Sequence, residues 1–259
     1  MIDYKIYIIS LRDQQSRRKS IERQLLSLGL NNFEFIDAID YRNSETHDLK
    51  TNFDIKMFSS KYGREPTSGE IGCLYSHIKA LKKTALLPNH FRVIILEDDA
   101  LLMPRIVDFI NCEDKLDGIH ILGYVKVTQK MAKYLCFKKP LINRISYQYF
   151  YTGVLNSEWS CGAVAYHLTP DAALKILKFI PARPSHVADD WRFYKQIVDI
   201  RHVRPLMVFE DYKNQPSSLE DRRQQTSQKK SMFITNINRV SSLCKAIIKN
   251  ILIYIRGIH

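Results

Sequence analysis

Three adjacent carboxylates, Glu97, Asp98 and Asp99, are the residues of this chain best suited to chemistry. They follow an uninterrupted apolar run at residues 93–96, which predicts a buried strand covered on both faces. An open α/β sheet binds ligands just beyond the carboxyl ends of its strands, and hard divalent cations prefer oxygen ligands. The pattern therefore predicts a metal that neutralises a phosphorylated ligand. The alternative is a solvated acidic turn in which Asp98 or Asp99 caps the next helix.

A second group of polar residues is expected on one helix. Thr67 and Glu70 have the spacing of a capping box, so a helix should begin there and continue to about residue 84. Glu70 and His77 are seven residues apart and share a face of that helix. Gly69 would let backbone amides approach a ligand closely. In the simpler interpretation, Glu70 only completes the cap and His77 is a half-buried structural histidine.

Charged residues also occur near both ends of the expected domain. Arg17 follows the first predicted strand, where its charge could meet a phosphate, whereas Arg18 could instead belong to a solvated basic helix face. Asp189 and Asp190 form a second acidic pair ahead of Trp191. Capping of the following helix is the structural alternative for this pair.

The elements that must position these residues alternate between strand and helix. This order predicts an α/β sheet. Residues 126–151 are aromatic and basic with weak periodicity, and we expect a mobile or substrate-facing region there. We expect strands at residues 4–9, 33–36, 93–96, 119–122, 162–168 and 203–209, and helices in the segments that contain Ile21, Leu25 and Leu28, residues 67–84, and residues 169–179.

Composition restricts the class of protein. A chain of 259 residues with 45% hydrophobic content can bury one large core. Five scattered cysteines without C-x-x-C spacing fit a reducing compartment better than a disulfide framework or a zinc site. No secretory layout and no bilayer-spanning apolar stretch is visible, so we expect a cytoplasmic protein. The net charge of +12 implies an anionic partner.

The end of the chain has a different character from the rest. We divide the chain into a domain at residues 1–221 and a basic, amphipathic tail at residues 222–259. Lys245, Lys249 and Arg256 fall near one face of an otherwise apolar helical pattern. Such a segment suits the interfacial plane of an anionic membrane, although it could instead pack on the domain as a terminal helix.

Several blocks occur in a characteristic order, namely residues 8–11 (IISL) with Arg17 and Arg18, residues 35–38 (FIDA), residues 68–77 (SGEIGCLYSH), residues 95–100 (ILEDDA), residues 162–166 (GAVAY) with residues 169–173 (TPDAA), and residues 188–191 (ADDW). Together they resemble glycosyltransferase family 25, the bacterial lipooligosaccharide galactosyltransferases and their relatives. The resemblance covers about residues 6–209. Residues 126–157 match no block, which leaves the choice of acceptor open.

The resemblance implies a GT-A-like α/β fold: a single nucleotide-sugar-binding domain with a mostly parallel central sheet and helices on both faces. It also implies that Mn²⁺ or Mg²⁺ bridges the donor diphosphate and an acidic pair. Asp99 is then the first metal ligand, Glu97 has the matching spacing, and His202 is a candidate third ligand. Asp98 or Glu97 could instead hold hydroxyl groups of the donor.

The remaining roles also come from the resemblance. Asp190, with Asp189 as second choice, would take the proton of the acceptor hydroxyl in an inverting displacement. Tyr149, Tyr151 and Trp159 are aromatic candidates for an acceptor platform. The residues expected to line the site of the UDP-sugar donor are Ser10, Leu11, Arg17, Gly69, Glu70, His77, Glu97 and Asp98.

We therefore expect a glycosyltransferase peripheral to the inner face of the cell membrane. It would move a hexose, galactose in the first instance and β-linked, from a UDP-sugar to a lipid-linked lipooligosaccharide or lipopolysaccharide acceptor. One alternative is a glucosyltransferase of the same family that uses UDP-glucose. Another is a metal-dependent phosphohydrolase, which would need more histidine and aspartate ligands than the chain offers. A nucleic-acid-binding protein is disfavoured because no aromatic-basic motif is present.

Overall fold

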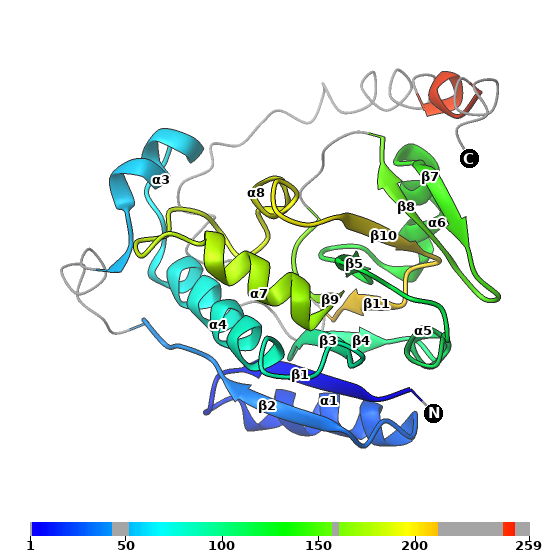
Figure 1. Ribbon diagram of the computed structural model, residues 1–259, viewed down its shortest axis with the longest axis horizontal. Helices are drawn as coiled ribbons and strands as arrows, with labels where there is room; N and C mark the ends of the chain where they lie inside the picture. Colours follow the sequence, from blue (N-terminus) through cyan, green and yellow to red (C-terminus); the bar gives the residue numbers. More distant parts are fainter. Residues whose placement is uncertain (1, 43–51, 157–160, 212–245, 252–259) are drawn as a thin grey trace.

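An eight-stranded sheet forms the centre of the computed structural model, which describes residues 2–42, 52–156, 161–211 and 246–251 (Figure 1). The chain builds the sheet from strands far apart in sequence, so the carboxyl end of β3 meets residues from several segments. In spatial order the strands are β2 (Phe33–Asp37), β1 (Tyr4–Ser10), β3 (Arg92–Glu97), β9 (Ala165–Leu168), β5 (Ile119–Ile121), β10 (Ile200–Arg204), β8 (Tyr151–Leu155) and β7 (Leu141–Ser146).

The expected α/β class is confirmed, but the sheet is mixed rather than mostly parallel. β1 runs parallel to both β2 and β3, and β10 runs parallel to β5. β9 lies between β3 and β5 and is antiparallel to both, and the β7–β8 pair and the β8–β10 pair are also antiparallel. The reason is the insertion of β9, together with a β7–β8 hairpin that needs only a short connection.

Helices cover both faces of this sheet, as expected. On one face Ile94 and Leu96 of β3 pack with α1 (Gln15–Ser27) and α5 (Ile106–Ile110). On the other face Val93 and Ile95 pack with α4 (Ser68–Thr84) and α7 (Pro170–Phe179), which lie side by side in Figure 1. Successive residues of a strand point to opposite faces, so a strand with helices on both sides, such as β3, needs apolar residues at every position.

A smaller sheet of three strands lies against the end of the large one. It consists of β4 (Ala100–Leu102), β11 (Val208–Glu210) and β6 (Gly123–Tyr124), with β11 in the middle. β11 is antiparallel to β4, and Glu210 pairs with Ala100. Because Ala100 directly follows the three acids, this pairing brings Glu210 beside them.

Most helix boundaries follow local sequence signals. α4 begins with the predicted capping box, in which Thr67 and Glu70 bond each other's backbone amides. α7 begins at Pro170 after Thr169, whose hydroxyl accepts from the amide of Ala172. α1 is followed by Gly29, whose φ of +72° is a conformation that side-chain-bearing residues rarely adopt.

Two expectations about secondary structure are corrected. Residues 126–151, where no helix or strand was expected, contain α6 (Gln129–Lys138) and β7, and β8 begins at their end. α6 has no fully buried residue, and apolar residues lie on its exposed face as well as on the face with Ala132 and Leu135 that packs on the core, so its sequence lacks a clear apolar periodicity. The strand expected at residues 203–209 is two strands, β10 and β11, on either side of Pro205, which lacks a donor for a sheet ladder.

The proposed boundary at residue 221 lies outside the described residues, as does most of the tail. Residues 246–251 form a helical segment in which Ala246 is buried. The side-chain amide of Asn250 donates to the carbonyl of Phe137 at 3.0 Å, so this segment contacts α6. No helix within the described ranges has the length and apolar character needed to span a bilayer.

Candidate active site

The turn between β3 and β4 carries Asp98 and Asp99, and both are buried despite their charge. Asp98 accepts from the hydroxyl of Ser10 at 2.7 Å and from the guanidinium of Arg17 at 3.0 Å. Arg17 also lies 3.8 Å from Asp99. The alternative of a solvated acidic turn is therefore excluded, because both carboxylates are buried at the carboxyl ends of β1 and β3 and Asp98 is hydrogen-bonded to Ser10 and Arg17.

Asp99 is the most perturbed of the three acids. Burial raises the pKa of its carboxyl well above the usual value, and the charges of Glu97, Glu210 and Asp98 raise it further, while Arg17 lowers it. Its Oδ1 is buried without a hydrogen-bond partner. Asp99 therefore experiences the charges of three other carboxylates, opposed by that of Arg17. A buried oxygen without a partner among excess negative charge fits a divalent cation with hard oxygen ligands.

Glu210 belongs to this site but was absent from the sequence-based prediction. One of its carboxylate oxygens accepts from the backbone amide of Lys126 at 2.6 Å, which fixes the end of β11. The signal for it was present: Glu210 and Asp211 follow the apolar residues 206–209, the same pattern as the acids after β3. That Glu210 meets Asp99 depends on the β4–β11 pairing, which no local pattern reveals.

Glu97 points away from Asp98, because neighbouring strand residues face opposite sides of a sheet. Its Oε1 lies 3.4 Å from Nε2 of His77, and Nδ1 of His77 lies 2.9 Å from the hydroxyl of Tyr166. The structure thus brings together Glu97 and His77, which were predicted separately as residues of the donor site, on the α4 side of the sheet.

The end of β1 is held by the start of α1. Arg18 donates to the carbonyl of Ser10 at 2.9 Å and to Asp37 at 2.6 Å, so it is not a solvated helix residue. Leu11 follows Ser10, and its carbonyl accepts from the Ser10 hydroxyl at 3.2 Å. Ser10, Leu11 and Arg17 therefore lie together with Asp98, as expected.

Glu70 has a structural role, in which its negative charge is neutralised by an arginine. It completes the capping box and forms a two-pronged ion pair with Arg64, at 2.8 and 2.6 Å. Gly69 lies in the first turn of the same helix. Gly72, one turn further, packs closely: a Cβ there would lie 2.6 Å from the carbonyl oxygen of Ile39. Close packing against the loop after β2 therefore explains that glycine.

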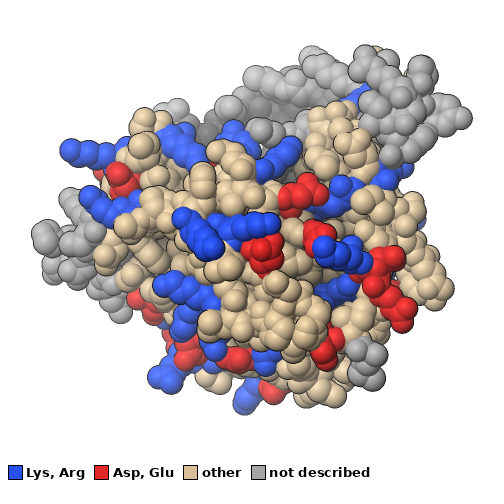
Figure 2. Space-filling view, viewed as in Figure 1, with Lys and Arg blue, Asp and Glu red and all other residues tan. Residues whose placement is uncertain are grey.

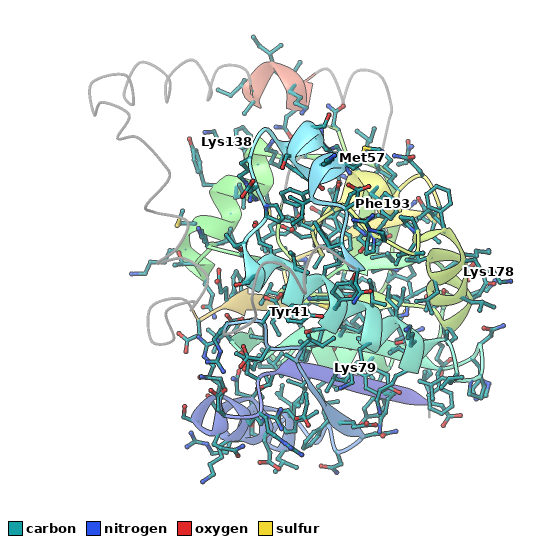
Figure 3. The ribbon with its side chains drawn as sticks, turned by 90° about the vertical axis from the view of Figure 1, so that its left-hand side faces the viewer. Tyr41, Met57, Lys79, Lys138, Lys178 and Phe193 are labelled. Carbon is teal, nitrogen blue, oxygen red and sulfur yellow. The ribbon has the colours of Figure 1, made fainter. Side chains whose placement is uncertain are left out.

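Asp190 is the N-cap of α8 (Trp191–Tyr194), and its Oδ1 accepts from the amide of Phe193 at 3.3 Å. Its Oδ2 accepts from Lys61 and from the hydroxyl of Tyr62, each at 2.5 Å. Burial raises the pKa of Asp190, but these two hydrogen bonds outweigh burial and leave it lowered. α3 (Ile55–Tyr62) and α8 consequently lie side by side, as the labels of Met57 and Phe193 show in Figure 3. Both oxygens of Asp190 are engaged.

Asp189, the neighbour of Asp190, is half-buried. Its charge contributes to the raised pKa values of Cys161 and Arg64. Trp191 packs edge-on against Tyr166 and donates to the carbonyl of Gly162 at 3.0 Å, so Trp191 is a structural contact.

His202 does not lie with the acid cluster. It pairs with Ile121, which pairs with Tyr166, which pairs with Ile95 of β3. Three strand spacings of about 4.8 Å separate it from β3, on the order of 14 Å. Its Nδ1 lies 3.0 Å from the Tyr124 hydroxyl, and burial lowers its pKa to about 3. The suggested third ligand is therefore a buried core histidine.

The aromatic acceptor candidates are divided. Tyr149 is exposed, whereas Tyr151 is half-buried and has the guanidinium of Arg144 5.2 Å from its ring centroid. Trp159 lies outside the described residues.

Solved structures with similar chains are distant. A glycosyltransferase involved in glycosylation of the major capsid of PBCV-1 shares 13% identity, covers 68% of this chain and 64% of its own, and has a TM-score of 0.33. The inositol-1-phosphate CTP transferase of T. maritima shares 14% identity, covers 85% of this chain and 93% of its own, and has a TM-score of 0.40. Both scores are below 0.5, so neither structure bears on the activity.

Sequence relatives are more informative. A glycosyltransferase 25 family member of Aedes aegypti is 27% identical over 217 residues, which are 79% of this chain and 35% of the relative. One of Anopheles gambiae is 29% identical over 102 residues, 38% of this chain and 17% of the relative. The chain thus spans about a third or less of the length of these relatives. The model of glycosyltransferase family 25 (LPS biosynthesis protein) matches residues 3–191, and the chain therefore belongs to this family of sugar-transferring enzymes.

Proposed function

We propose that this glycosyltransferase moves a hexose, galactose in the first instance, from a UDP-sugar to a lipid-linked oligosaccharide. One observation carries the proposal: the unpartnered, buried Oδ1 of Asp99 among three other carboxylates at the carboxyl end of β3. A site with this charge suits a cation that accompanies a diphosphate. Asp99 and Glu210 would hold Mn²⁺ or Mg²⁺, which when bound supplies Lewis-acid stabilisation of the departing UDP.

The residues around Asp99 have distinct tasks in this proposal. Arg17 offers guanidinium donors to the diphosphate, since it is held at the site by Asp98. Ser10 fixes the other oxygen of Asp98, so the orientation of that carboxylate is set before the donor binds. Pre-set groups need no rearrangement when charge develops on the leaving group.

Proton removal from the acceptor requires a carboxylate with an accessible oxygen. Asp190 is committed to Lys61, Tyr62 and the cap of α8. Of the two acids proposed from the sequence, Asp189 is the less buried and is therefore favoured as the general base, and inversion at the anomeric carbon follows from direct attack of the activated hydroxyl. Such assistance typically accelerates a reaction by about 10²- to 10⁴-fold.

An exposed apolar surface supports binding to an anionic membrane. Its side chains are interspersed with Lys130, Lys133, Lys138 and Lys249, a combination that suits the interface of an anionic bilayer. This surface, termed the α6 surface, would bring the enzyme to a lipid-linked acceptor. It comprises the exposed side chains of Met131, Tyr134 and Phe137 on α6 and Ile247, Ile248 and Ile251 on the adjoining helical segment.

Figure 2 shows one face of the molecule on which Lys and Arg side chains are interspersed with Asp and Glu. That face offers no continuous basic stripe of the kind that follows a nucleic-acid backbone.

The test is release of UDP from UDP-galactose and from UDP-glucose, with Mn²⁺ and with a chelator, and with and without short glycan acceptors. Metal-dependent release that prefers one sugar and rises with an acceptor supports the proposal, and the preference decides between galactose and glucose. Asp99→Asn should abolish release, whereas Asp117→Asn, which changes an exposed acid, should not. Phosphate release from unrelated esters at a similar rate would indicate a phosphohydrolase instead.

A further inference from the structure

A second cluster of metal-binding side chains lies on the opposite side of β3 from Asp98. Cys73, His77 and Glu97 each offer one ligand atom, and these atoms all lie within 4.8 Å of one another. Within the part of the chain that the structure describes, no other three histidine, cysteine or acidic residues meet this condition. Two elements produce the cluster: Cys73 and His77 are one turn apart on α4, and Glu97 ends β3.

The ring of His77 is oriented as in a metal ligand. Its Nδ1 lies 2.9 Å from the hydroxyl of the buried Tyr166, which leaves Nε2 directed at Glu97. Metal-binding histidines usually engage their second nitrogen in this way, which fixes the tautomer. The arrangement does not fit a Cys–His–acid catalytic triad, because in a triad the acid and the nucleophile contact different ring nitrogens. Here Tyr166 occupies the nitrogen that the acid would need.

The distances suit a tetrahedral ion. With the usual Zn–N, Zn–O and Zn–S bond lengths, ligand atoms in a tetrahedral site are about 3.3–3.6 Å apart. Nε2 of His77 and Oε1 of Glu97 are 3.4 Å apart in the protein. The sulfur of the half-buried Cys73 lies within 4.8 Å of both atoms.

We propose that Cys73, His77 and Glu97 bind a Zn²⁺ ion, with the fourth position open to water or to a substrate oxygen. A thiolate and an imidazole select zinc over magnesium or manganese, which prefer oxygen alone. This site is chemically distinct from the all-oxygen cluster around Asp99. The zinc ion joins α4 to the carboxyl end of β3 and engages Glu97, which otherwise adds to the negative charge facing Asp99.

Cobalt substitution tests this proposal without measuring activity. Co²⁺ is added to the chelator-treated full chain in a reductant that lacks thiols, and the absorption spectrum is recorded. Wild type should develop a thiolate-to-cobalt charge-transfer band that corresponds to one Co²⁺ at the thiolate site and that Zn²⁺ abolishes; Co²⁺ held by carboxylates alone gives no such band. Cys73→Ser should lack the band, and His77→Gln should lose at least tenfold in affinity. Tyr166→Phe should bind about 10- to 100-fold more weakly, because the support of the ring is lost.

Matched controls separate this site from the donor site and from other thiols. Cys136→Ser removes a different half-buried thiol, and Asp99→Asn removes the acid of the donor site. Both should keep the band. Absence of the band in folded wild-type protein, or its persistence in Cys73→Ser, would overturn the proposal. Failure of the UDP-sugar proposal would leave the spectrum unchanged, so the two outcomes are distinguishable.

Discussion

Asp99→Asn should stabilise the metal-free protein while it destroys the site. The wild-type carboxyl has a buried oxygen without a partner and a raised pKa, so folding in the absence of metal is penalised at neutral pH. An unsatisfied buried polar group typically costs about 1–3 kcal/mol. Asparagine keeps the shape, removes the charge, and offers amide donors to the neighbouring carboxylates in place of an unpaired acceptor. We therefore expect a gain of about 1–3 kcal/mol, and about 2–4 °C in Tm for each kcal/mol in a domain of this size.

The pH dependence of this gain has a definite sign. A carboxyl with a raised folded-state pKa destabilises the fold wherever the unfolded chain is ionised, that is, above its ordinary value near 4. The advantage of Asn over Asp should hence be largest at pH 7 and vanish as the pH approaches 4. Comparison of the two proteins at each pH cancels the contributions of groups remote from Asp99, such as His120, while the neighbouring carboxylates contribute to the difference in the same direction.

The assay is thermal unfolding in chelator at pH 7 and pH 5, followed by titration with Mg²⁺. A ligand present at 100 times its Kd stabilises by about 2.7 kcal/mol. Mg²⁺ should thus raise the Tm of wild type but not of Asp99→Asn. Because Mg²⁺ binds thiolates poorly, it should not occupy the site that contains Cys73. A variant less stable than wild type without metal, or an equal response of both proteins to Mg²⁺, would refute the assignment of Asp99. Asp117→Asn, at an exposed position, should change neither property.

Three other predictions concern the base, the core and the membrane. Asp189→Asn should lower kcat by about 10²- to 10⁴-fold with UDP affinity retained. Asp190→Asn should mainly reduce the free energy of unfolding, measured with denaturant. Equal losses of kcat in the two variants would contradict the assignment of Asp189 as base and Asp190 as structural acid. Burial lowers the pKa of His120 to about 3, so between pH 7 and pH 5 this histidine takes up a proton in the unfolded chain but not in the folded protein. The free energy of unfolding should therefore fall by about 2 kcal/mol over this range because of His120. Unfolding of His120→Phe should show a correspondingly smaller loss. Replacement of Met131, Tyr134 and Phe137 on the α6 surface by serine should reduce sedimentation of the protein with anionic vesicles at least tenfold. Sedimentation with neutral vesicles should stay unchanged. Undiminished binding to anionic vesicles would exclude that surface.

Local sequence was sufficient for features that depend on neighbouring residues. The capping box at Thr67 and Glu70 formed as expected, and the apolar run before Glu97 became a strand buried on both faces. Alternation along that strand also explains why Glu97 turns toward α4 while Asp98 turns toward Arg17. The acids that end this strand were thus predictable as site residues. Their placement on two faces, with Glu97 on one and Asp98 on the other, follows from the same alternation.

Features that depend on long-range pairing were not predictable. Glu210 lies near Asp99 only because β11 pairs with β4, and the distance of His202 from the acids follows from the insertion of β9 and β5 between β3 and β10. α6 was missed for a different reason. Its apolar residues lie on both its half-buried face and its exposed face, so its sequence shows no single apolar stripe, and Thr128 at its start was the capping signal.

The central position of β11 in the small sheet has a consequence for synthesis on the ribosome. Ser10, Arg17 and Asp98 are translated early and can assemble while the chain is still growing, but Glu210 follows Asp99 by roughly 110 residues, about 5–20 s at usual elongation rates. A nascent chain during that interval presents an incomplete acidic cluster. If Glu210 holds a metal as proposed, its capture is reserved for chains in which β4, β11 and β6 have already come together.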